Sequence, residues 1–334
     1  IDRVLREIDP DTFARLRTSH GGGVPLRFES PDEHLNFVCV MALLNACSGY
    51  RDAFHAATGR GAADNMRRLA LGLFLTRDDD GPAPLSAAGL AHLRAPLLAE
   101  VLGVSLHTET PHPTLPGIIV GSRGGPLADA LDALAAMCRT TGAFLTSRGC
   151  ADLGAYVAQA VAAALEDRAA PLDVLLGALA EVPGFADART VDGRQVYIYK
   201  KAFLLIHTLL TSDRIGHPAL AALAARSRAD IVPQLPLFVD NVIPTLLIHW
   251  GVLTNVDVPP PGHELSHDAG YRIRAAALAA GSQIAARAHA LASEPPLAFL
   301  AHVTEAELDA YFWSIAKEPA LRALPRLAEK STMY

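Results

Sequence analysis

The sequence predicts a mostly α-helical protein that forms a single compact domain over residues 1–334. Three observations predict this fold class. Apolar residues recur at helical spacing along most of the chain, two segments open with helix-capping signals, and strand signals are few. Of the 334 residues, 51% are hydrophobic and 19% are charged, so the chain is too apolar to be disordered.

Two capping boxes mark the starts of helices. In Ser30-Pro31-Asp32-Glu33, Glu33 follows Ser30 by three residues, and Pro31 takes the first helical position. In Thr304-Glu305-Ala306-Glu307, Glu307 follows Thr304 by the same spacing. Between them, periodic segments rich in Ala and Leu predict further helices, because such sequences have high helix propensity and pack closely. These segments are residues 62–76, 126–140, 151–167, 171–181, 200–211, 217–226, 241–253 and 268–292.

Strands are expected at two places only. Residues 190–199 predict a short β-hairpin that turns at Asp192-Gly193, and residues 115–120 predict one edge strand. Soft connectors are expected at 78–82, 108–125 and 256–263, which are rich in Asp, Pro or Gly. None of them is long enough to separate independent domains.

Charge and hydropathy narrow the classes of partner. Twenty-nine Lys and Arg against 35 Asp and Glu give a net charge of −6, so no basic field is expected to hold DNA or RNA as a polymer. A single small nucleotide is not excluded by this charge. The chain also lacks a run of about 18 uninterrupted apolar residues, which excludes a membrane-spanning helix.

The four cysteines are Cys39, Cys47, Cys138 and Cys150, and they show neither zinc-ribbon nor CxxC spacing. We expect free, buried thiols in a reduced, cytoplasmic protein. No signal-peptide pattern opens the chain, and because the first residue is Ile1 and not Met, we expect a few residues to precede it.

One motif resembles a zinc site. His263-Glu264-Leu265-Ser266-His267 has the HExxH spacing, which on a helix places two imidazoles on one face. Prolines at 259–261 and Gly262 come directly before it, and Ile273 stands where the extended form of the motif needs a third His. We therefore expect a solvated first helical turn and no metal. Two glycine-rich turns, at 59–62 and 121–125, are interpreted as ordinary turns, with anion binding as the alternative.

The most informative candidate is Asp240, which precedes an apolar helix that carries Pro244 in its early turns. On composition alone we favour a helix N-cap, where Asp is a common residue. The alternative is a half-buried carboxylate that faces a ligand, stabilises positive charge at a sugar C1′ and orients a water. Upstream, Lys200 and Lys201 start another helix. A helix N-terminus disfavours cations, so we expect them to face solvent or an anionic partner.

An ordered set of segments resembles the queuosine salvage proteins, which are queuosine 5′-phosphate N-glycosylases that release queuine. The segments are Leu44-Asn45, Ser48-Gly49-Tyr50-Arg51, Tyr199-Lys200-Lys201-Ala202, Phe238-Val239-Asp240 with Pro244, Gly251-Val252-Leu253, Ile273-Arg274-Ala275, Leu308-Asp309 through Trp313, and Tyr334. The resemblance covers nearly all of the chain, and it is the order of the set that makes it specific.

The resemblance implies a helical fold related in shape to the helix-hairpin-helix DNA glycosylases. It also implies that Asp240 is the catalytic aspartate and that Lys200 and Asn45 occupy family positions in the substrate site. No metal or organic cofactor is implied. The expected substrate is a small nucleotide. Lys200 or Lys201 is expected to contact its 5′-phosphate, and Asn241 is a candidate for recognition of its base. Three aromatic residues are candidate pocket residues, with core or terminal packing as an equal alternative: Tyr50, Trp313 and Tyr334.

The sequence departs from the family at five positions. Asn241-Val242 replaces Tyr-Arg, Thr208 and Leu210 replace an aspartate and a tryptophan, and Ala46 replaces a phenylalanine. These departures leave two alternatives open, namely cleavage of another modified N-riboside nucleotide and a nucleotide-binding protein without activity. The sequence leaves the oligomeric state open.

Overall fold

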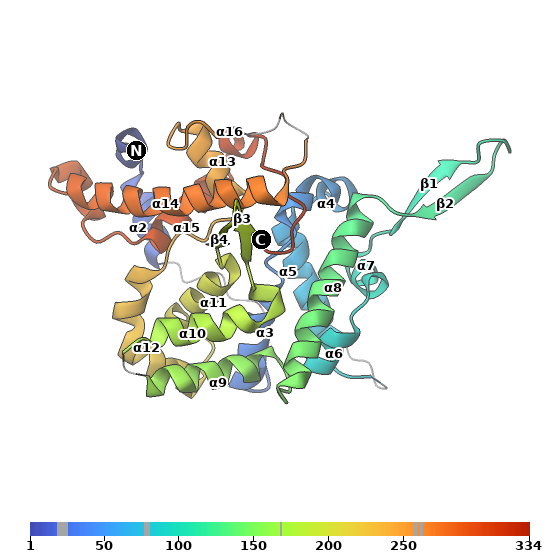
Figure 1. The fold of residues 1–334 in the computed structure, drawn as a ribbon, viewed down its shortest axis with the longest axis horizontal. Coiled ribbons are helices and arrows are strands. Elements are labelled where there is room, and N and C mark those ends of the chain that lie inside the picture. The colour runs from blue at the N-terminus through green and yellow to red at the C-terminus, as the bar shows by residue number, and fades with distance from the viewer. Residues whose placement is uncertain (19–25, 77–80, 168, 257–259, 261–262) are drawn as a thin grey trace.

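A computed structural model describes residues 1–18, 26–76, 81–167, 169–256, 260 and 263–334, and most of them are helical (Figure 1). The predicted mostly α-helical class is confirmed. The α-helices are α1 (Asp2–Arg6), α2 (Pro10–Thr18), α3 (Pro31–Leu43), α4 (Arg51–Thr58), α5 (Ala62–Leu75), α6 (Ala87–His92), α7 (Ala95–Leu102), α8 (Pro126–Ser147), α9 (Leu153–Glu166), α10 (Pro171–Glu181), α11 (Lys200–Thr211), α12 (Pro218–Ile231), α13 (Val242–His249), α14 (His267–Leu291), α15 (Glu305–Ile315) and α16 (Pro319–Arg322). Short 3-10 helices are η1 (Ser48–Tyr50), η2 (Pro183–Phe185), η3 (Val232–Gln234) and η4 (Pro295–Leu300).

Local sequence signals set most helix starts. Ser30 Oγ accepts a hydrogen bond from Glu33 N at 3.1 Å, and Thr304 and Glu307 form the complete capping box at α15. The predicted helix over 241–253 is wrong at its end, because α13 stops at His249. Gly251 adopts φ +69°, and the N–H groups of the next two residues both donate to Leu247 O, which closes the helix.

The predicted hairpin near 190–199 is confirmed. Strands β3 (Ala188–Val191) and β4 (Arg194–Tyr197) pair antiparallel, and the two turn residues, Asp192 and Gly193, both have positive φ. Positive φ at both central positions is the type I′ geometry that Asp-Gly favours.

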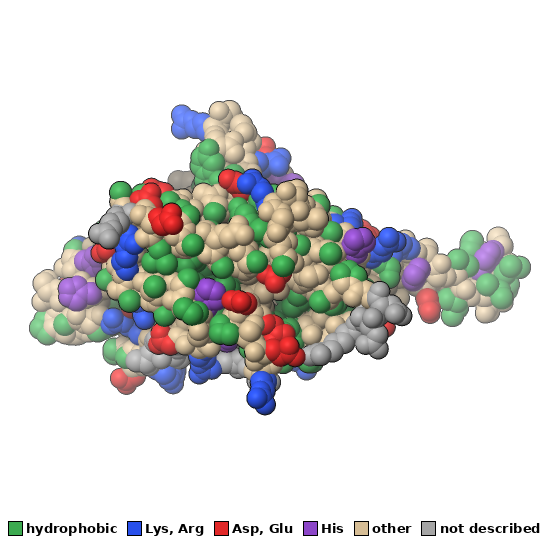
Figure 2. All heavy atoms as spheres, turned by 90° about the horizontal axis from the view of Figure 1, so that it is seen from below, with side chains coloured by type: hydrophobic (Ala, Val, Ile, Leu, Met, Phe, Trp, Pro, Cys, Tyr) green, Lys and Arg blue, Asp and Glu red, His purple; other side chains and the backbone are tan. Residues whose placement is uncertain are grey.

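The connector predicted at 108–125 is wrong. It is a second antiparallel hairpin, in which β1 (His107–Pro111) pairs with β2 (Ile119–Arg123). The expected edge strand at 115–120 is right only at its end: Ile119 and Val120 belong to β2, whereas Pro116 and Gly117 lie in the connection between the two strands. This hairpin extends clear of the helical body, with exposed hydrophobic side chains towards its end (Figures 1 and 2).

The predicted connectors at 78–82 and 256–263 lie largely outside the described residues. The turn at 59–62 joins α4 to α5, and Asn65 Nδ2 donates to the carbonyl oxygens of Arg60 and Gly61 there. Along the described part of the chain, no helix has both the length and the apolar composition that a membrane crossing requires.

The four cysteines are free and buried, as predicted. Burial raises the pKa of the Cys47 and Cys138 thiols to about 12. A thiol in such surroundings is a poor nucleophile.

Two large apolar clusters make up most of the core. The first joins α3 and α5 to α12, and the second joins α1 and α2 to α13, α14 and α15. The extended segment between η3 and α13 lies between them: Leu235 and Phe238 pack into the first cluster, whereas Leu237 and Val239 pack into the second. Asp240, the next residue, therefore lies where the two clusters meet.

The C-terminal tail packs against this junction. Tyr334 O accepts a hydrogen bond from Ser48 N, and the buried Glu329 passes directly over Gly49. A Cβ at Gly49 would lie 1.7 Å from Glu329 O, so the close approach of the tail requires glycine there.

Candidate active site

Asp240 is 6% exposed and sits at the start of α13. Its Oδ1 accepts hydrogen bonds from Val242 N at 2.6 Å and Ile243 N at 3.4 Å, as a capping side chain does, although the N-cap residue of α13 is Asn241 and Asp240 lies one residue before it. Oδ2 accepts no hydrogen bond from the described residues. Four side-chain atoms of the described residues are fully buried and have no hydrogen-bond partner, and Asp240 Oδ2 is not among them. Because Oδ2 has no partner and is not fully buried, it borders accessible space.

Lys200 and Asn45 meet beside this carboxylate. Lys200 is 3% exposed, and its Nζ donates to Asn45 Oδ1 at 2.6 Å, which joins the start of α11 to the end of α3. Burial lowers the pKa of Lys200, while the charges of Asp240 and then Asp309 act in the opposite direction. The structure therefore brings together three residues that the resemblance selected from distant segments.

Asp309, on α15, belongs to the same cluster although it was not among the predicted site residues. It is 9% exposed, and its Oδ1 accepts a hydrogen bond from Phe238 N at 2.9 Å. Burial raises the pKa of Asp309 well above 3.8, the charge of Asp240 raises it further, and Lys200 opposes both. The sequence signal for Asp309 is a carboxylate on the apolar face of a predicted helix, and the sequence-based prediction did not use it.

Lys201 is buried away from this cluster. Its Nζ donates to Leu43 O at 3.1 Å, to Thr332 O at 2.8 Å and to Met137 Sδ at 3.3 Å. These three contacts use all the donors of an ammonium group. We therefore correct the expectation that Lys201 faces solvent or an anionic partner: it joins α11 to the end of α3 and to the C-terminal tail.

Asn241 also has a structural position. Its Nδ2 donates to Ser48 O at 3.3 Å and to Leu327 O at 3.1 Å, which uses both donors of the amide. The residue is 4% exposed. Its side chain holds the start of α13 against η1 and the C-terminal tail, and it offers no free N–H to a base.

The three candidate aromatic residues occupy different surroundings. Tyr334 donates from its hydroxyl to Glu329 Oε2 at 2.9 Å, and the charge of Asp240 also acts on it. Tyr50 is buried, and burial raises its pKa to about 12. Trp313 is half-buried, follows Asp309 by one turn of α15, and has the Lys317 Nζ 3.7 Å from its ring centroid.

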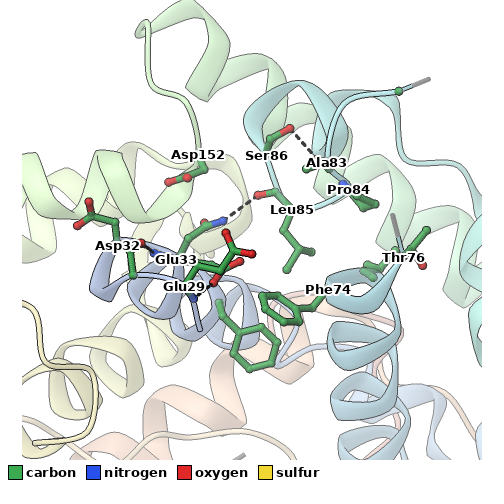
Figure 3. Close-up of a pocket in the computed structure, with 15 residues that line it drawn as sticks. Glu29, Asp32, Glu33, Phe74, Thr76, Ala83, Pro84, Leu85, Ser86 and Asp152 are labelled. Carbon is green, nitrogen blue, oxygen red and sulfur yellow. Dashed lines mark hydrogen bonds between the residues drawn. The ribbon is translucent and has the colours of Figure 1, made fainter. Parts of the chain in front are cut away.

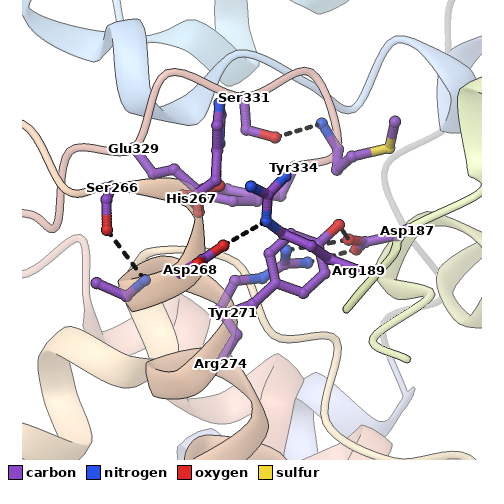
Figure 4. Close-up of polar contacts among 12 residues, drawn as sticks. Asp187, Arg189, Ser266, His267, Asp268, Tyr271, Arg274, Glu329, Ser331 and Tyr334 are labelled. Carbon is purple, nitrogen blue, oxygen red and sulfur yellow. Dashed lines mark hydrogen bonds and ion pairs between the residues drawn. The ribbon is translucent and has the colours of Figure 1, made fainter. Parts of the chain in front are cut away.

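A buried ion pair supports the backbone next to Asp240. Arg274 contacts both oxygens of Asp187, and its Nε donates to Val239 O at 3.2 Å. Figure 4 shows this pair with Tyr271 and with Tyr334, whose ring centroid lies 4.4 Å from the guanidinium carbon of Arg274. Burial opposes the charge on Arg274, but Asp187 outweighs it, so the pKa of the guanidinium is raised.

Comparison with family models matches residues 131–333 to the queuosine salvage proteins. The match covers more than half of the chain and contains Lys200, Asp240 and Asp309. The chain belongs to the queuosine salvage protein family. A comparison with individual curated proteins finds no match. Membership of the family supports a role in queuosine salvage.

Three of the departures from the family now have a structural setting in this queuosine salvage protein. Leu210 is 1% exposed and belongs to the first apolar cluster, as does Ala46. Thr208 Oγ1 donates to Leu204 O of its own helix at 2.8 Å. Neither Leu210 nor Ala46 supplies the aromatic ring that the family pattern has there.

The HExxH string does not form a helical pair of imidazoles. Helix α14 of this family member begins at His267 and is capped by Ser266, so His263 lies before the helix. Within the described residues no three His, Cys, Asp or Glu side chains are grouped to hold a metal ion.

A cavity of about 580 Å³ lies elsewhere, at the end of α3 opposite Asn45. Figure 3 shows Glu29, Asp32, Glu33 and Asp152 at this cavity, with Phe74 beside them. None of the predicted site residues lines it, so it is separate from the cluster around Asp240.

Proposed function

We propose that this queuosine salvage protein is an N-glycosidase that hydrolyses queuosine 5′-phosphate to queuine and ribose 5-phosphate. The observation that carries the proposal is the cluster of Asp240, Asp309 and Lys200 at the start of α13. Two carboxyl groups in different surroundings, with a buried cation beside them, are suited to acid–base chemistry on a small substrate.

Asp240 would act at the anomeric carbon. Breaking the bond between C1′ and the base nitrogen develops positive charge on C1′ and the ring oxygen, and a nearby carboxylate stabilises that charge. Oδ1 is held by two backbone N–H groups, whereas Oδ2 borders accessible space and is free to face ribose and water. As water attacks C1′, Asp240 would take its proton.

Asp309 would supply a proton to the departing base. Its burial and the neighbouring charge of Asp240 raise its pKa well above that of an ordinary aspartate, so Asp309 holds its proton to a higher pH and is the better proton donor of the two. In this scheme the base leaves with the electron pair of the C1′–N bond and gains a proton from Asp309. Lys200, held by Asn45, offsets the negative charge of the pair.

The direct test is incubation of the protein with queuosine 5′-phosphate, followed by mass spectrometry for free queuine. We expect queuine to accumulate with the native protein and not with Asp240→Asn. A melting shift with the nucleotide but no product would overturn the enzymatic proposal and favour a nucleotide-binding protein.

A second candidate is cleavage of the same bond in another modified purine-like nucleotide. The observation that favours it is the absence of aromatic side chains at Ala46 and Leu210. Release of base from such a nucleotide, at a kcat/KM above that for queuosine 5′-phosphate, would establish it.

A further inference from the structure

Exposed apolar side chains gather on the β1–β2 hairpin, which extends clear of the helical body (Figures 1 and 2). Every residue of both strands is exposed. Seven large hydrophobic side chains are exposed among the described residues, and four of them lie on this hairpin: Leu115, Ile118, Ile119 and Val120. Such a concentration of exposed apolar side chains marks a surface that another molecule covers. The hairpin also precedes residues 131–333, so it lies outside the part of the chain that matches the family.

Two strands by themselves make an incomplete sheet. The hairpin forms a separate two-stranded sheet, and such a ribbon is marginally stable in water unless further strands or a helix complete it. Polar contacts hold its base: Arg123 pairs with Asp132 of α8, and Thr108 Oγ1 donates to Ser122 O at 3.3 Å. The apolar residues lie towards the other end, where a further strand would cover them.

The hydrogen-bond pattern shows which backbone groups of the hairpin point outward. His112 N donates to Ile118 O, and Gly124 N donates to Leu106 O, so these are two hydrogen-bonded pairs of the ladder. Hydrogen-bonded pairs alternate with non-hydrogen-bonded pairs along antiparallel strands. The residues of the alternate pairs therefore direct their N–H and C=O groups away from the hairpin: His107/Arg123, Glu109/Gly121 and Pro111/Ile119.

The two outward edges differ in chemistry. On β1, Pro111 has no N–H to offer and Glu109 places a charge at the centre of the edge, and both features protect an edge from pairing. On β2, the outward residues Ile119, Gly121 and Arg123 keep all three N–H groups, and Arg123 at the base is the one charged residue of the three. The edge of β2 is therefore the one that is open to a further strand.

A second copy of β2 fits this edge. In antiparallel pairing about a two-fold axis, Gly121 faces the partner's Gly121 and Ile119 faces the partner's Arg123, so no like charges oppose each other. The same pairing through β1 would oppose two Glu109 carboxylates. Joined through β2, the two hairpins form one four-stranded sheet, which has enough strands to be stable where two alone are marginal.

We propose that the β1–β2 hairpin joins two copies of this protein into a two-fold dimer, through antiparallel pairing of β2 with β2 of the partner copy. Two paired ribbons bury a small area, so the dimer is reversible and depends on protein concentration. The cluster around Asp240 lies on the helical body, so this proposal holds or fails independently of the proposed activity.

Sedimentation velocity of the native protein from about 1 to 500 μM tests the association. We expect a monomer at the lowest concentration and a dimer at the highest. Ile119→Lys places a charge on the β2 edge of both copies and should raise the dissociation constant of the dimer by about 10-fold or more. Leu75→Lys is the matched control and should keep the native constant, because Leu75 is 65% exposed and Ile119 is 64% exposed.

Two substitutions at Gly121 test whether backbone pairing holds the dimer. Gly121→Pro removes the outward N–H at the two-fold axis without removing a hydrogen bond between β1 and β2. Gly121→Ala keeps that N–H, and a Cβ at this position meets nothing within 4 Å. We expect Gly121→Pro to raise the dissociation constant by about 10-fold or more and Gly121→Ala to leave it close to native. The melting temperature of each variant checks its fold.

A native protein that stays monomeric at every concentration would overturn the proposal. So would a dimer whose dissociation constant is unchanged in both Ile119→Lys and Gly121→Pro, because another surface would then hold it. Equal weakening by Gly121→Ala and Gly121→Pro would contradict the backbone pairing. Assemblies that keep growing beyond the dimer would contradict the closed two-fold arrangement.

Discussion

Asp309 on α15 lies close enough to Asp240 at the start of α13 for the negative charge of Asp240 to raise the pKa of Asp309. The two residues come from helices separated by the whole length of α14, and Phe238 N connects them, since it donates to Asp309 two residues before Asp240. An ordinary helix cap lies at the surface, whereas Asp240 is buried with a second carboxyl group near it.

Asp240→Asn should leave the fold intact and remove turnover by about three orders of magnitude or more. Asparagine is also a favoured cap, so it keeps an oxygen for Val242 N while it loses the negative charge. Queuine release and the melting temperature are the two measurements. The exposed Asp230→Asn is the control, and native activity in Asp240→Asn would reject the assignment.

Asp309→Asn should lower kcat by about 10²- to 10⁴-fold, as expected for loss of a general acid, and should remove the alkaline limb of the pH profile. The amide keeps an acceptor for Phe238 N, so folding is expected to persist. An unchanged alkaline limb in the variant would show that Asp309 supplies no proton.

The same substitution should change how stability depends on pH. The folded pKa of Asp309 lies well above the ordinary 3.8, so the stability that it contributes is complete below that value and is lost as the pH rises through the folded pKa. We expect the native protein to lose free energy of unfolding relative to Asp309→Asn as the pH is raised above 4 and through the folded pKa. Denaturant titrations at several pH values measure this difference, and a constant difference would contradict the burial argument.

Lys201→Met should change stability in the opposite sense. Burial lowers the pKa of Lys201 from 10.5 to about 7, so its contribution is complete above 10.5 and is lost as the pH falls through 7. Relative to Lys201→Met, the native protein should gain free energy of unfolding between pH 7 and pH 10. The same titrations provide the test, and a flat difference across this range would mean that Lys201 keeps its charge when folded.

Arg274→Met should destabilise the protein by about 3–5 kcal/mol, because it leaves the Asp187 carboxylate buried without its partner. Arg272→Gln, two residues earlier on α14, removes an exposed pair with Asp192 and should have a much smaller effect. Chemical denaturation measures both variants. Equal effects would show that the buried pair does not support the segment before Asp240.

Gly49→Ala should destabilise the protein by about 1–3 kcal/mol, since the new methyl group overlaps Glu329 O and displaces the C-terminal tail. Gly177→Ala, inside α10 with open space around its Cβ position, should instead stabilise slightly through helix propensity. Thermal melting compares the two, and a neutral Gly49→Ala would show that the tail has room to move.

Much of the secondary structure could be predicted because its causes are local. The capping boxes at Ser30 and Thr304 and the Asp192-Gly193 turn act over a few residues, and the structure places helices and a hairpin there. The pairing of 107–111 with 119–123 was missed, because every residue of the two strands is exposed and no buried face gives an alternating pattern. The likeness to DNA glycosylases and the single-domain expectation remain predictions.

The sequence by itself determined the helical class, the family, and the choice of Asp240, Lys200 and Asn45, because each depends on short segments and their order. Only the tertiary structure decided which groups each charged side chain contacts. Lys201 and Lys200 are adjacent in the chain, yet one ammonium is used up by backbone carbonyls and the other faces two carboxyl groups. The charge balance around a side chain depends on neighbours that are tens to more than a hundred residues away in the sequence, so no local pattern predicts it.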